Sequence, residues 1–222
     1  SKEILLFKNL QKIIRMINNE INLTRLIEGD DYWISQVYDS IWPFYLNPNK
    51  ILDGKKFVDI GSGCGFPGLA YAITHPNSEV YLVDSSKKKT DALKQIINAL
   101  NISNRVIVIH DRIEKIAHNT LYRNNFDIGT TRAVGSPSTV AEYILPLLNN
   151  SGTGLLYCGK WNKNDEVKIR NSLNILKGSI KEIKSINLPQ RKGERNIIFI
   201  KPDKTCPASY PRAVGKPAKY PL

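Results

Sequence analysis

A twelve-residue stretch in the first third of the chain restricts the fold more than any other. Residues 57–68 read FVDIGSGCGFPG, an apolar run followed by glycines at every second position and then a proline. Gly61, Gly63 and Gly65 can adopt left-handed backbone conformations and let a ligand approach the main chain closely. A buried strand that leads through such a loop into a helix is typical of nucleotide-type sites in α/β proteins.

The spacing of these glycines separates two kinds of ligand site. A dinucleotide fingerprint that starts at Gly61 requires a glycine at position 66, and this chain has Phe66 there. Instead, Asp59 precedes glycines at 61, 63 and 65, a pattern that resembles the first motif of S-adenosylmethionine-dependent methyltransferases. The loop therefore favours a methyl-donor site over a dinucleotide site.

The pattern of apolar residues after position 55 predicts the fold class. Short apolar runs alternate with helical stretches, which is typical of βαβ units around a parallel sheet. We expect strands at 56–60, 79–84, 105–109, 126–130 and 153–158, and helices near 67–75, 86–101, 112–118, 137–148 and 164–176. Two later runs, 179–188 and 194–201, have no helix between them and would form an antiparallel hairpin. The prediction is a Rossmann-like α/β fold, with about seven mostly parallel strands and an antiparallel last strand.

Three regions are expected along the chain. Residues 1–50 form a small helical preface, with helices near 3–19 and 31–46, which is too short to bury a core and must pack on the main domain. Residues 51–203 form the ligand-binding domain. Residues 204–222 form a basic tail whose prolines argue against a helix or a central strand.

The charge of the chain indicates a polyanionic partner. The 32 Lys and Arg residues outnumber the 20 Asp and Glu residues, giving a net charge of +12, and half of this surplus lies in residues 188–222. Such a surplus favours nucleic acid as a partner. A lysine-rich solvated surface remains the alternative for the chain, and a disordered solubilising segment remains the alternative for the tail.

Other compositional features bear on location and metal content. The three cysteines are scattered and indicate neither a disulfide framework nor a metal site. No apolar run approaches the roughly 20 residues of a membrane span. We therefore expect a cytoplasmic, monomeric protein without a metal.

Polar residues at the carboxyl ends of the expected strands are the ligand-site candidates, because ligands of open parallel sheets bind at that edge. Asp84 ends the second strand, where a carboxylate can accept both hydroxyls of a ribose. Its alternative role is to cap the helix that starts at Ser85 or Ser86.

The next two strand ends carry further candidates. Ile113 can pack against an adenine face, and Glu114 can bond the edge of that base, although both could also simply begin a helix. Arg132 follows the fourth strand and could grip a carboxylate or phosphate, or pair with a nearby acid.

Taken together, these segments resemble the bacterial small-subunit ribosomal RNA guanine-N7 methyltransferase family (RsmG, formerly GidB). The resemblance spans nearly the whole chain and rests on Asp59–Gly68, Val83-Asp84-Ser85, Arg112-Ile113-Glu114, Thr131-Arg132-Ala133, Gly193-Glu194-Arg195 and Tyr210-Pro211-Arg212, with Asn22-Leu23-Thr24 and Asp39-Ser40 in the preface. The chain departs from the family at Gln36, where a histidine is common, and in the order Gly159-Lys160.

The resemblance implies a class I methyltransferase fold and S-adenosylmethionine as cofactor. It implies that the cofactor lies against Gly61, Phe66, Asp84, Ser85, Ser86, Ile113 and Glu114, supported by Asp59, Gly63 and Gly65, with Arg132 near the transfer centre. The implied partner is small-subunit ribosomal RNA or a ribosomal particle. Candidate RNA contacts are the basic residues Lys160, Arg191, Arg195, Arg212, Lys216 and Lys219.

Two other functional classes stay open on the residues alone. A nicotinamide-dependent oxidoreductase shares this type of sheet, although Phe66 breaks its fingerprint and the charge is then unexplained. A non-catalytic RNA-binding protein would explain the charge but not the intact glycine loop. Methylation of guanine N7 needs no general base, because this nitrogen carries an unprotonated lone pair.

Overall fold

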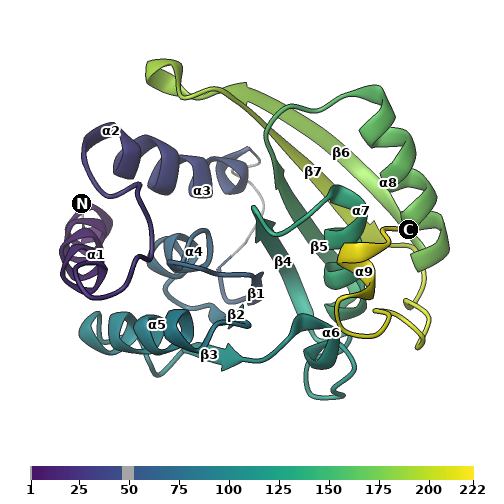
Figure 1. Cartoon of the computed structure of the whole chain (residues 1–222), viewed down its shortest axis with the longest axis horizontal. Coiled ribbons are helices and arrows are strands. Elements are labelled where there is room, and N and C mark those ends of the chain that lie inside the picture. The colour runs from purple at the N-terminus through teal and green to yellow at the C-terminus, as the bar shows by residue number, and fades with distance from the viewer. Residues whose placement is uncertain (1, 47–52) are drawn as a thin grey trace.

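A seven-stranded sheet forms the centre of the computed structural model, which describes residues 2–46 and 53–222 (Figure 1). The strand order is β3-β2-β1-β4-β5-β7-β6, and β7 runs antiparallel to both of its neighbours. The strands are β1 (Lys56–Ile60), β2 (Glu79–Asp84), β3 (Val106–His110), β4 (Phe126–Arg132), β5 (Leu148–Cys158), β6 (Gly178–Asn187) and β7 (Glu194–Pro202). This arrangement confirms the predicted Rossmann-like sheet with its antiparallel last strand.

Helices between the strands follow the predicted order, with shorter bounds in most cases. They are α4 (Gly68–Thr74), α5 (Lys87–Ala99), α6 (Ile113–Ile116), α7 (Pro137–Ile144) and α8 (Lys163–Leu176). Ser136 caps α7 as predicted, since its hydroxyl accepts a hydrogen bond from Thr139 N–H at 3.2 Å. The fifth strand begins five residues earlier than expected, because the residues that follow Leu148, at 149–151, are polar and partly exposed and carry no apolar signal.

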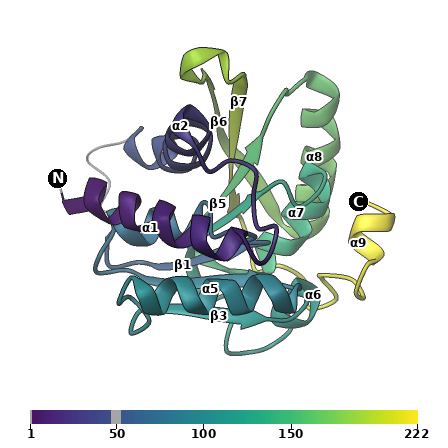
Figure 2. The ribbon, with the colours of Figure 1, turned by 60° about the vertical axis from the view of Figure 1, so that its left-hand side comes forward.

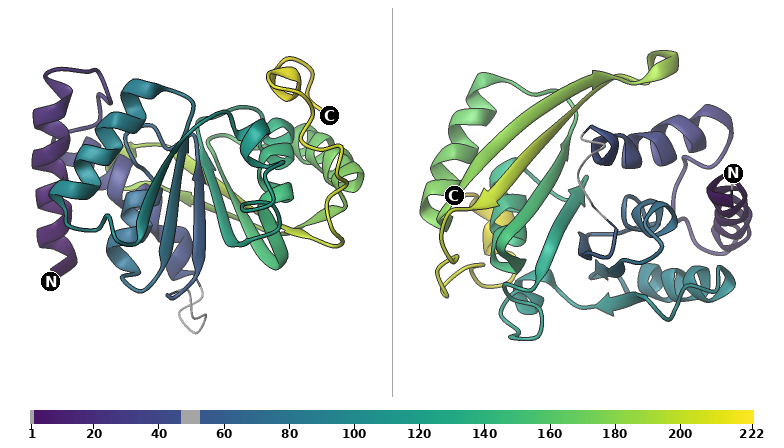
Figure 3. Two further views of the ribbon diagram at one scale, coloured as in Figure 1. Left: turned by 90° about the horizontal axis from the view of Figure 1, so that it is seen from below. Right: turned by 180° about the vertical axis from the view of Figure 1, so that it is seen from behind.

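Two hydrophobic cores cover the two faces of the sheet, as the alternation of side chains along each strand requires. Phe57 of β1 points into the core formed with α1 (Lys2–Asn18), α4 and α5. Its neighbour Val58 points into the core formed with α6, α7 and α8. The views in Figures 2 and 3 show the resulting three layers, with α1 lying along α5.

The helical preface packs on the first of these cores. Tyr32 is fully buried, and its hydroxyl donates a 2.6 Å hydrogen bond to the carbonyl of Phe7 on α1. The second predicted helix is one helical run interrupted by wide and tight turns: α2 (Gly29–Tyr32), a π-helical turn (Trp33–Tyr38), α3 (Asp39–Ile41) and a 3₁₀ turn (Trp42–Tyr45). The expected boundary at residues 50–51 lies outside the described residues.

The C-terminal tail is folded against the main domain, in contrast to the disordered solubilising segment that was its alternative. It contains a four-residue helix, α9 (Lys216–Lys219), despite its prolines. Arg123 donates hydrogen bonds to the carbonyls of Cys206, Pro207 and Tyr210, and the hydroxyl of Ser172 donates to the carbonyl of Leu222. These side-chain donors replace the ladder that a proline-rich backbone cannot form. Within the described ranges, no helix is both long and apolar enough to cross a bilayer.

Candidate active site

A cavity of about 230 Å³ lies where the glycine loop meets the carboxyl ends of β2 and β3. We call it the cofactor pocket. Gly61, Asp84, Ser85 and Ile113 line it, together with Asp111, Arg112, Val134, Tyr143 and Ala218. Four of the cofactor residues predicted from the sequence therefore meet at one cavity.

The glycine loop is held by backbone contacts that leave no room for side chains. The N–H groups of Gly61 and Ser62 donate to the carbonyl of Val83 at 2.8 and 3.0 Å, which joins the loop to β2. Gly61 has φ +71°, and a Cβ there would lie 2.4 Å from a methyl group of Val134. Only glycine satisfies both restrictions, so the backbone forms this wall of the pocket.

Asp84 bonds the glycine loop and also lines the cofactor pocket. Its Oδ2 accepts from Gly63 N–H and its Oδ1 accepts from Ser86 N–H, both at 2.9 Å. The bond to Ser86 holds the residue that precedes α5, and no described side chain forms a cap bond at the start of that helix, so the capping alternative is not seen. Ser86 itself does not line the cavity. Each carboxylate oxygen can accept more than one hydrogen bond, so Asp84 retains acceptors for ligand hydroxyls.

Asp59 and Phe66 support the loop from behind and do not line the cavity. Asp59 is fully buried, and it accepts hydrogen bonds from the Thr130 hydroxyl at 3.0 Å and from Gly68 N–H at 3.1 Å. Burial raises the pKa of Asp59 to about 6, against the opposing effect of these two bonds. The Phe66 ring packs edge-on against Tyr32 in the core, so its side chain is not the cofactor contact that the resemblance implied.

Glu114 stands next to the cavity wall with one oxygen unsatisfied. Its Oε1 accepts from Gly215 N–H, from Arg112 and from the Tyr143 hydroxyl. Burial alone would raise the pKa of Glu114, but the bonds from Gly215 and Arg112 outweigh it and lower the pKa, so the group is ionised at neutral pH. Its Oε2 is buried and has no hydrogen-bond partner within the described part of the chain.

These features fit the adenosine part of S-adenosylmethionine. Asp84 offers acceptors for ribose hydroxyls, and Ile113 and Val134 offer apolar surface for a base. The unpaired Oε2 of Glu114 is an acceptor without a donor, which an exocyclic amino group would supply. The glycine wall allows the ligand to approach the backbone.

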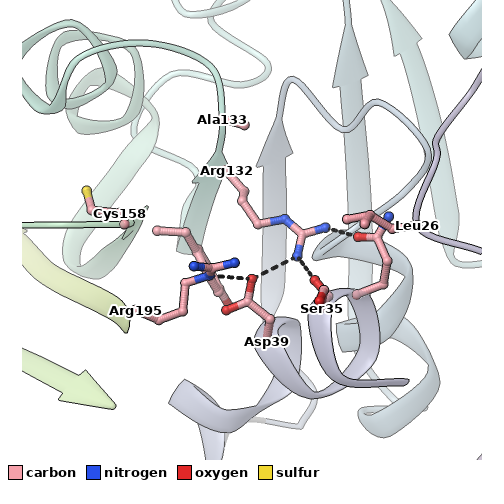
Figure 4. Close-up of a pocket in the computed structure, with 10 residues that line it drawn as sticks. Leu26, Ser35, Asp39, Arg132, Ala133, Cys158 and Arg195 are labelled. Carbon is pink, nitrogen blue, oxygen red and sulfur yellow. Dashed lines mark hydrogen bonds and ion pairs between the residues drawn. The ribbon is translucent and has the colours of Figure 1, made fainter. Parts of the chain in front are cut away.

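Arg132 lies in a second cavity, of about 360 Å³, at the carboxyl ends of β4 and β5 (Figure 4). We call it the polar pocket. Nη1 of Arg132 donates to the carbonyl of Ser35 at 3.1 Å and to Asp39 Oδ2 at 3.3 Å, and Nη2 donates to Gln36 Oε1. Arg132 therefore pairs with an acid, which was the alternative role, and does not line the cofactor pocket.

The two pockets are neighbours. Ala133 lines the polar pocket, and the next residue, Val134, lines the cofactor pocket. Gln36 ties them together further, since its amide donates to Cys64 Sγ in the glycine loop while its oxygen accepts from Arg132. The arrangement places a polar cavity beside the site that fits the cofactor.

Asp39 is the residue of the polar pocket that the sequence did not mark with a role. Its Oδ2 accepts from Arg132 and also from Arg195 Nε, at 3.2 Å. The only signal in the sequence was the Asp39-Ser40 pair within the family resemblance. Neither partner could be found by spacing, because both arginines lie far away along the chain.

The cysteine and tyrosine of this pocket are not available as nucleophiles or bases. Burial raises the pKa of the Cys158 thiol to about 12, so it stays protonated at neutral pH. Burial also raises the pKa of Tyr157 well above its ordinary value, and its hydroxyl donates a 2.6 Å hydrogen bond to the carbonyl of Ser40.

The predicted RNA contacts divide into three groups. Lys160, Arg191, Lys216 and Lys219 are exposed. Arg195 lies in the polar pocket. Arg212 is partly buried, and its guanidinium forms a forked pair with the fully buried carboxylate of Glu142, at 2.7 and 3.0 Å, so it anchors the tail. An RNA contact at Arg212 stays a prediction.

The fold and the cofactor pocket together define a methyltransferase of the Rossmann-like, S-adenosylmethionine-dependent class. An O-methyltransferase from Bacillus cereus in complex with SAH has the same fold, with a TM-score of 0.60 at 15% identity over 87% of this chain and 90% of that one. TrmK from M. capricolum, in complex with S-adenosyl-homocysteine, gives a TM-score of 0.54 at 17% identity over 72% and 69%.

Sequence comparison identifies the family. The family model described as "GidB: rRNA small subunit methyltransferase G" matches residues 3–197. Proteins named ribosomal RNA small subunit methyltransferase G from Prochlorococcus marinus strains MIT 9515 and NATL2A are 61% and 42% identical to the chain. The match covers all of this chain in both, and 92% and 89% of those proteins. The chain belongs to this family. The family resemblance, the enzyme class and the cofactor predicted from the sequence are confirmed, and neither alternative class gains support.

Proposed function

We propose that this enzyme transfers a methyl group from S-adenosylmethionine to N7 of a guanine in small-subunit ribosomal RNA, in the cytoplasm. The observation that carries the proposal is the polar pocket beside the cofactor pocket, a cavity whose described lining offers hydrogen-bonding groups but no histidine or lysine. Asp39 is engaged by two arginines, and the Cys158 thiol is protonated at neutral pH. An acceptor atom that carries no proton, such as guanine N7, needs no base.

The chemistry is a single displacement. When bound, S-adenosylmethionine supplies a methyl group on a positively charged sulfur. The lone pair of guanine N7 forms the new N–C bond as the S–C bond breaks, and the electrons of that bond remain on sulfur. The positive charge thus moves to the guanine ring, and no proton is transferred. The protein aligns the nitrogen with the methyl group and excludes water.

The residues that would align the cofactor are those of the cofactor pocket. Asp84 would orient the ribose, and the glycine loop would hold the backbone-facing side of the ligand. Ile113 and Glu114 would hold the base. Arg132 and Asp39 would shape the side from which the acceptor enters.

Exposed cations are proposed to hold the RNA backbone. Lys160 follows β5, Arg191 lies at the turn between β6 and β7, and Lys216 and Lys219 lie on α9 near Ala218 of the cofactor pocket. Their positions around the pockets suit contacts to phosphates, which carry no sequence information but set register. The expected monomeric state stays a prediction.

The test is to incubate the protein with methyl-labelled S-adenosylmethionine and small-subunit RNA, both free and assembled into ribosomal particles. Mass mapping of nuclease fragments should place the label on one guanine, and borohydride–aniline cleavage at that nucleotide should identify N7. Large-subunit RNA serves as the control and should stay unlabelled. Label on another atom, or no label on either form of the RNA, would overturn the proposal.

A further inference from the structure

One carboxylate oxygen in the polar pocket has no partner. The side chain of Asp39 is 3% exposed, and its Oδ2 accepts from both Arg132 and Arg195. Its Oδ1 is buried and accepts no hydrogen bond from residues 2–46 or 53–222. A buried acceptor of this kind is costly to leave unpaired and indicates a donor that arrives from outside the chain. Asp39 lines the cavity, so its carboxylate borders on a ligand that occupies the polar pocket.

The chain holds this carboxylate firmly in place. Asp39 follows a π-helical turn, a rare helical geometry that often occurs at functional sites. The same turn carries Ser35 and Gln36, which accept hydrogen bonds from Arg132. Arg195 approaches Asp39 from β7 on the other side, as Figure 4 shows. The carboxylate is therefore oriented before any ligand binds.

The four RNA bases differ in the hydrogen-bond donors that they can offer to a carboxylate. An ionised carboxylate only accepts hydrogen bonds. Guanine presents two adjacent donors on its Watson–Crick edge, N1–H and the N2 amino group. Adenine and cytosine each present an unprotonated ring nitrogen there, and uracil presents one N–H between two carbonyls. A carboxylate is thus complementary to guanine and repels the ring nitrogens of adenine and cytosine.

Arg195 adds a hydrogen-bond donor beside the Asp39 carboxylate. Its Nε bonds Asp39 and its Nη1 donates to the carbonyl of Glu194, whereas Nη2 has no partner in the described part of the chain. Guanine carries O6 next to N1–H, so a donor beside the carboxylate suits the carbonyl of the same base. The pair of groups suits the Watson–Crick edge of guanine, and the N2 amino group is the donor of that edge that uracil, which also carries an N–H beside a carbonyl, lacks.

We propose that the polar pocket is the binding site for the acceptor guanine, and that Asp39 Oδ1 accepts a hydrogen bond from its N2 amino group. The inference rests on the proposed function and names the residue that recognises its substrate. With the Watson–Crick edge at Asp39, the adjoining Hoogsteen edge, which carries N7, can face the segment Ala133–Val134 shared with the cofactor pocket. An enzyme that acts on a base commonly reads it in this way outside the stack.

The same contact also assists the reaction. Methylation at N7 places a positive charge on the guanine ring, which makes N1–H and the N2 amino group stronger donors. A hydrogen bond from the N2 amino group to the Asp39 carboxylate therefore strengthens as the new bond forms. An interaction that is stronger in the transition state than in the ground state raises the rate as well as the affinity.

The test combines Asp39→Asn with small-subunit RNA in which inosine replaces the target guanine. Inosine lacks the N2 amino group and keeps N1–H, O6 and N7. For the wild-type enzyme we expect the replacement to lower kcat/KM by about tenfold, and for guanine RNA we expect Asp39→Asn to lower it by about thirtyfold. In the Asp39→Asn variant, guanine and inosine RNA should react within about twofold of each other, because the group that distinguishes them is gone.

Controls separate recognition from folding. The affinity of Asp39→Asn for S-adenosylmethionine, measured by calorimetry, should stay within about twofold of wild type, because Asp39 lies outside the cofactor pocket. Asp31→Asn is the matched control, an acid of the same helical run that pairs with Lys192 and is 47% exposed. It should leave both RNA rates unchanged.

The outcomes distinguish this inference from the proposed function. If the wild-type enzyme labels guanine N7 but treats inosine and guanine RNA alike, the role of Asp39 is wrong and the proposed function stands. An unchanged guanine-to-inosine ratio in Asp39→Asn has the same meaning. If the wild-type enzyme labels no guanine N7, both fail together. If the Asp39→Asn variant does not fold, the ratio of guanine to inosine reaction of the wild-type enzyme still tests whether the N2 amino group is recognised.

Discussion

The cofactor pocket and the polar pocket are neighbours, but they are built in different ways. The cofactor pocket consists largely of backbone and of residues at the ends of successive strands, and its central contact joins Gly63 and Asp84, 21 residues apart. The polar pocket is organised around three charged side chains, in which Asp39 meets Arg132 and Arg195 across 93 and 156 residues. A site made from local backbone geometry can be predicted from the spacing of residues in the sequence, whereas a site made from distant side chains cannot.

One wall of the cofactor pocket is nevertheless formed by a segment far away along the chain. Ala218 of the C-terminal tail lines the cavity, and Gly215 N–H bonds Glu114 across 101 residues. The tail in turn is anchored by the pair of Arg212 with Glu142. The contrast between the pockets can therefore be tested at the points where local and long-range contacts meet.

The largest effect is expected from Arg212→Ala. This change leaves the Glu142 carboxylate, which is 0% exposed, without its counter-ion, and should lower the free energy of unfolding by about 3–5 kcal/mol. It should also weaken S-adenosylmethionine binding, because the tail wall is released. Urea denaturation and calorimetry measure the two effects. Lys204→Ala, an exposed tail residue, is the control, and equal stability of the two variants would mean that the tail does not depend on this pair.

The next effect concerns the pH dependence of the loop support. Burial raises the pKa of Asp59 to about 6, while a carboxyl in the unfolded chain titrates near ~3.9. The native state therefore keeps a proton that the unfolded state has lost. This contribution to stability is complete below about pH 4 and is lost as the pH rises through about 6.

Asp59→Asn should remove that dependence, since an amide does not titrate. Relative to the variant, the wild-type protein should lose up to roughly 3 kcal/mol of stability between pH 4 and pH 8. Urea unfolding at a series of pH values measures the difference, in which other titrating groups cancel. A difference that stays constant with pH would show that Asp59 is ionised throughout.

A smaller effect is expected from Asp84→Ala, which tests the local pocket directly. Loss of charge-assisted bonds to the ligand and to the loop should weaken S-adenosylmethionine binding by at least tenfold, about 1.4 kcal/mol. The RNA affinity of the variant should not change. Asp91→Ala, on the exposed side of α5, is the control for cofactor affinity. Unchanged binding by Asp84→Ala would exclude Asp84 from the cofactor site.

The smallest effect is expected at the surface beyond both pockets. Arg191→Ala should weaken RNA binding by only about two- to threefold and reduce the slope of log K against log salt by about one, as for one lost phosphate contact. Filter binding at several salt concentrations measures both quantities, with the exposed Lys8→Ala on α1 for comparison. If the two variants have the same slope, Arg191 does not contact the RNA.

The cofactor pocket was largely predictable because several of its lining residues stand at a strand end or just after it. Asp84 and Ile113 follow apolar runs whose ends the periodicity marks, so their common edge could be inferred without a structure. Phe66 was misplaced because the loop motif does not reveal which way a side chain points. It packs inward on Tyr32, a residue of the preface.

The tail and the arginines were less predictable for a related reason. Composition places Arg212 in a basic, proline-rich segment, and such a segment is ordinarily exposed. Only the position of the fully buried Glu142 on α7 shows that this arginine has a counter-ion. Arg132 was correctly placed at the end of a strand, but its partners Ser35, Gln36 and Asp39 lie on the preface, whose packing the periodicity does not specify.

The sequence by itself determined the sheet, the glycine loop, the family and the acid at the end of β2. These depend on the local spacing of residues, and a strand, a turn and a helix impose that spacing wherever they occur. The tertiary structure alone decided that Arg132 meets Asp39 and Arg195, that Arg212 is an anchor, and that the tail closes one wall of the cofactor pocket. Those contacts join residues from elements far apart in the chain, and their partners are set by how the elements pack.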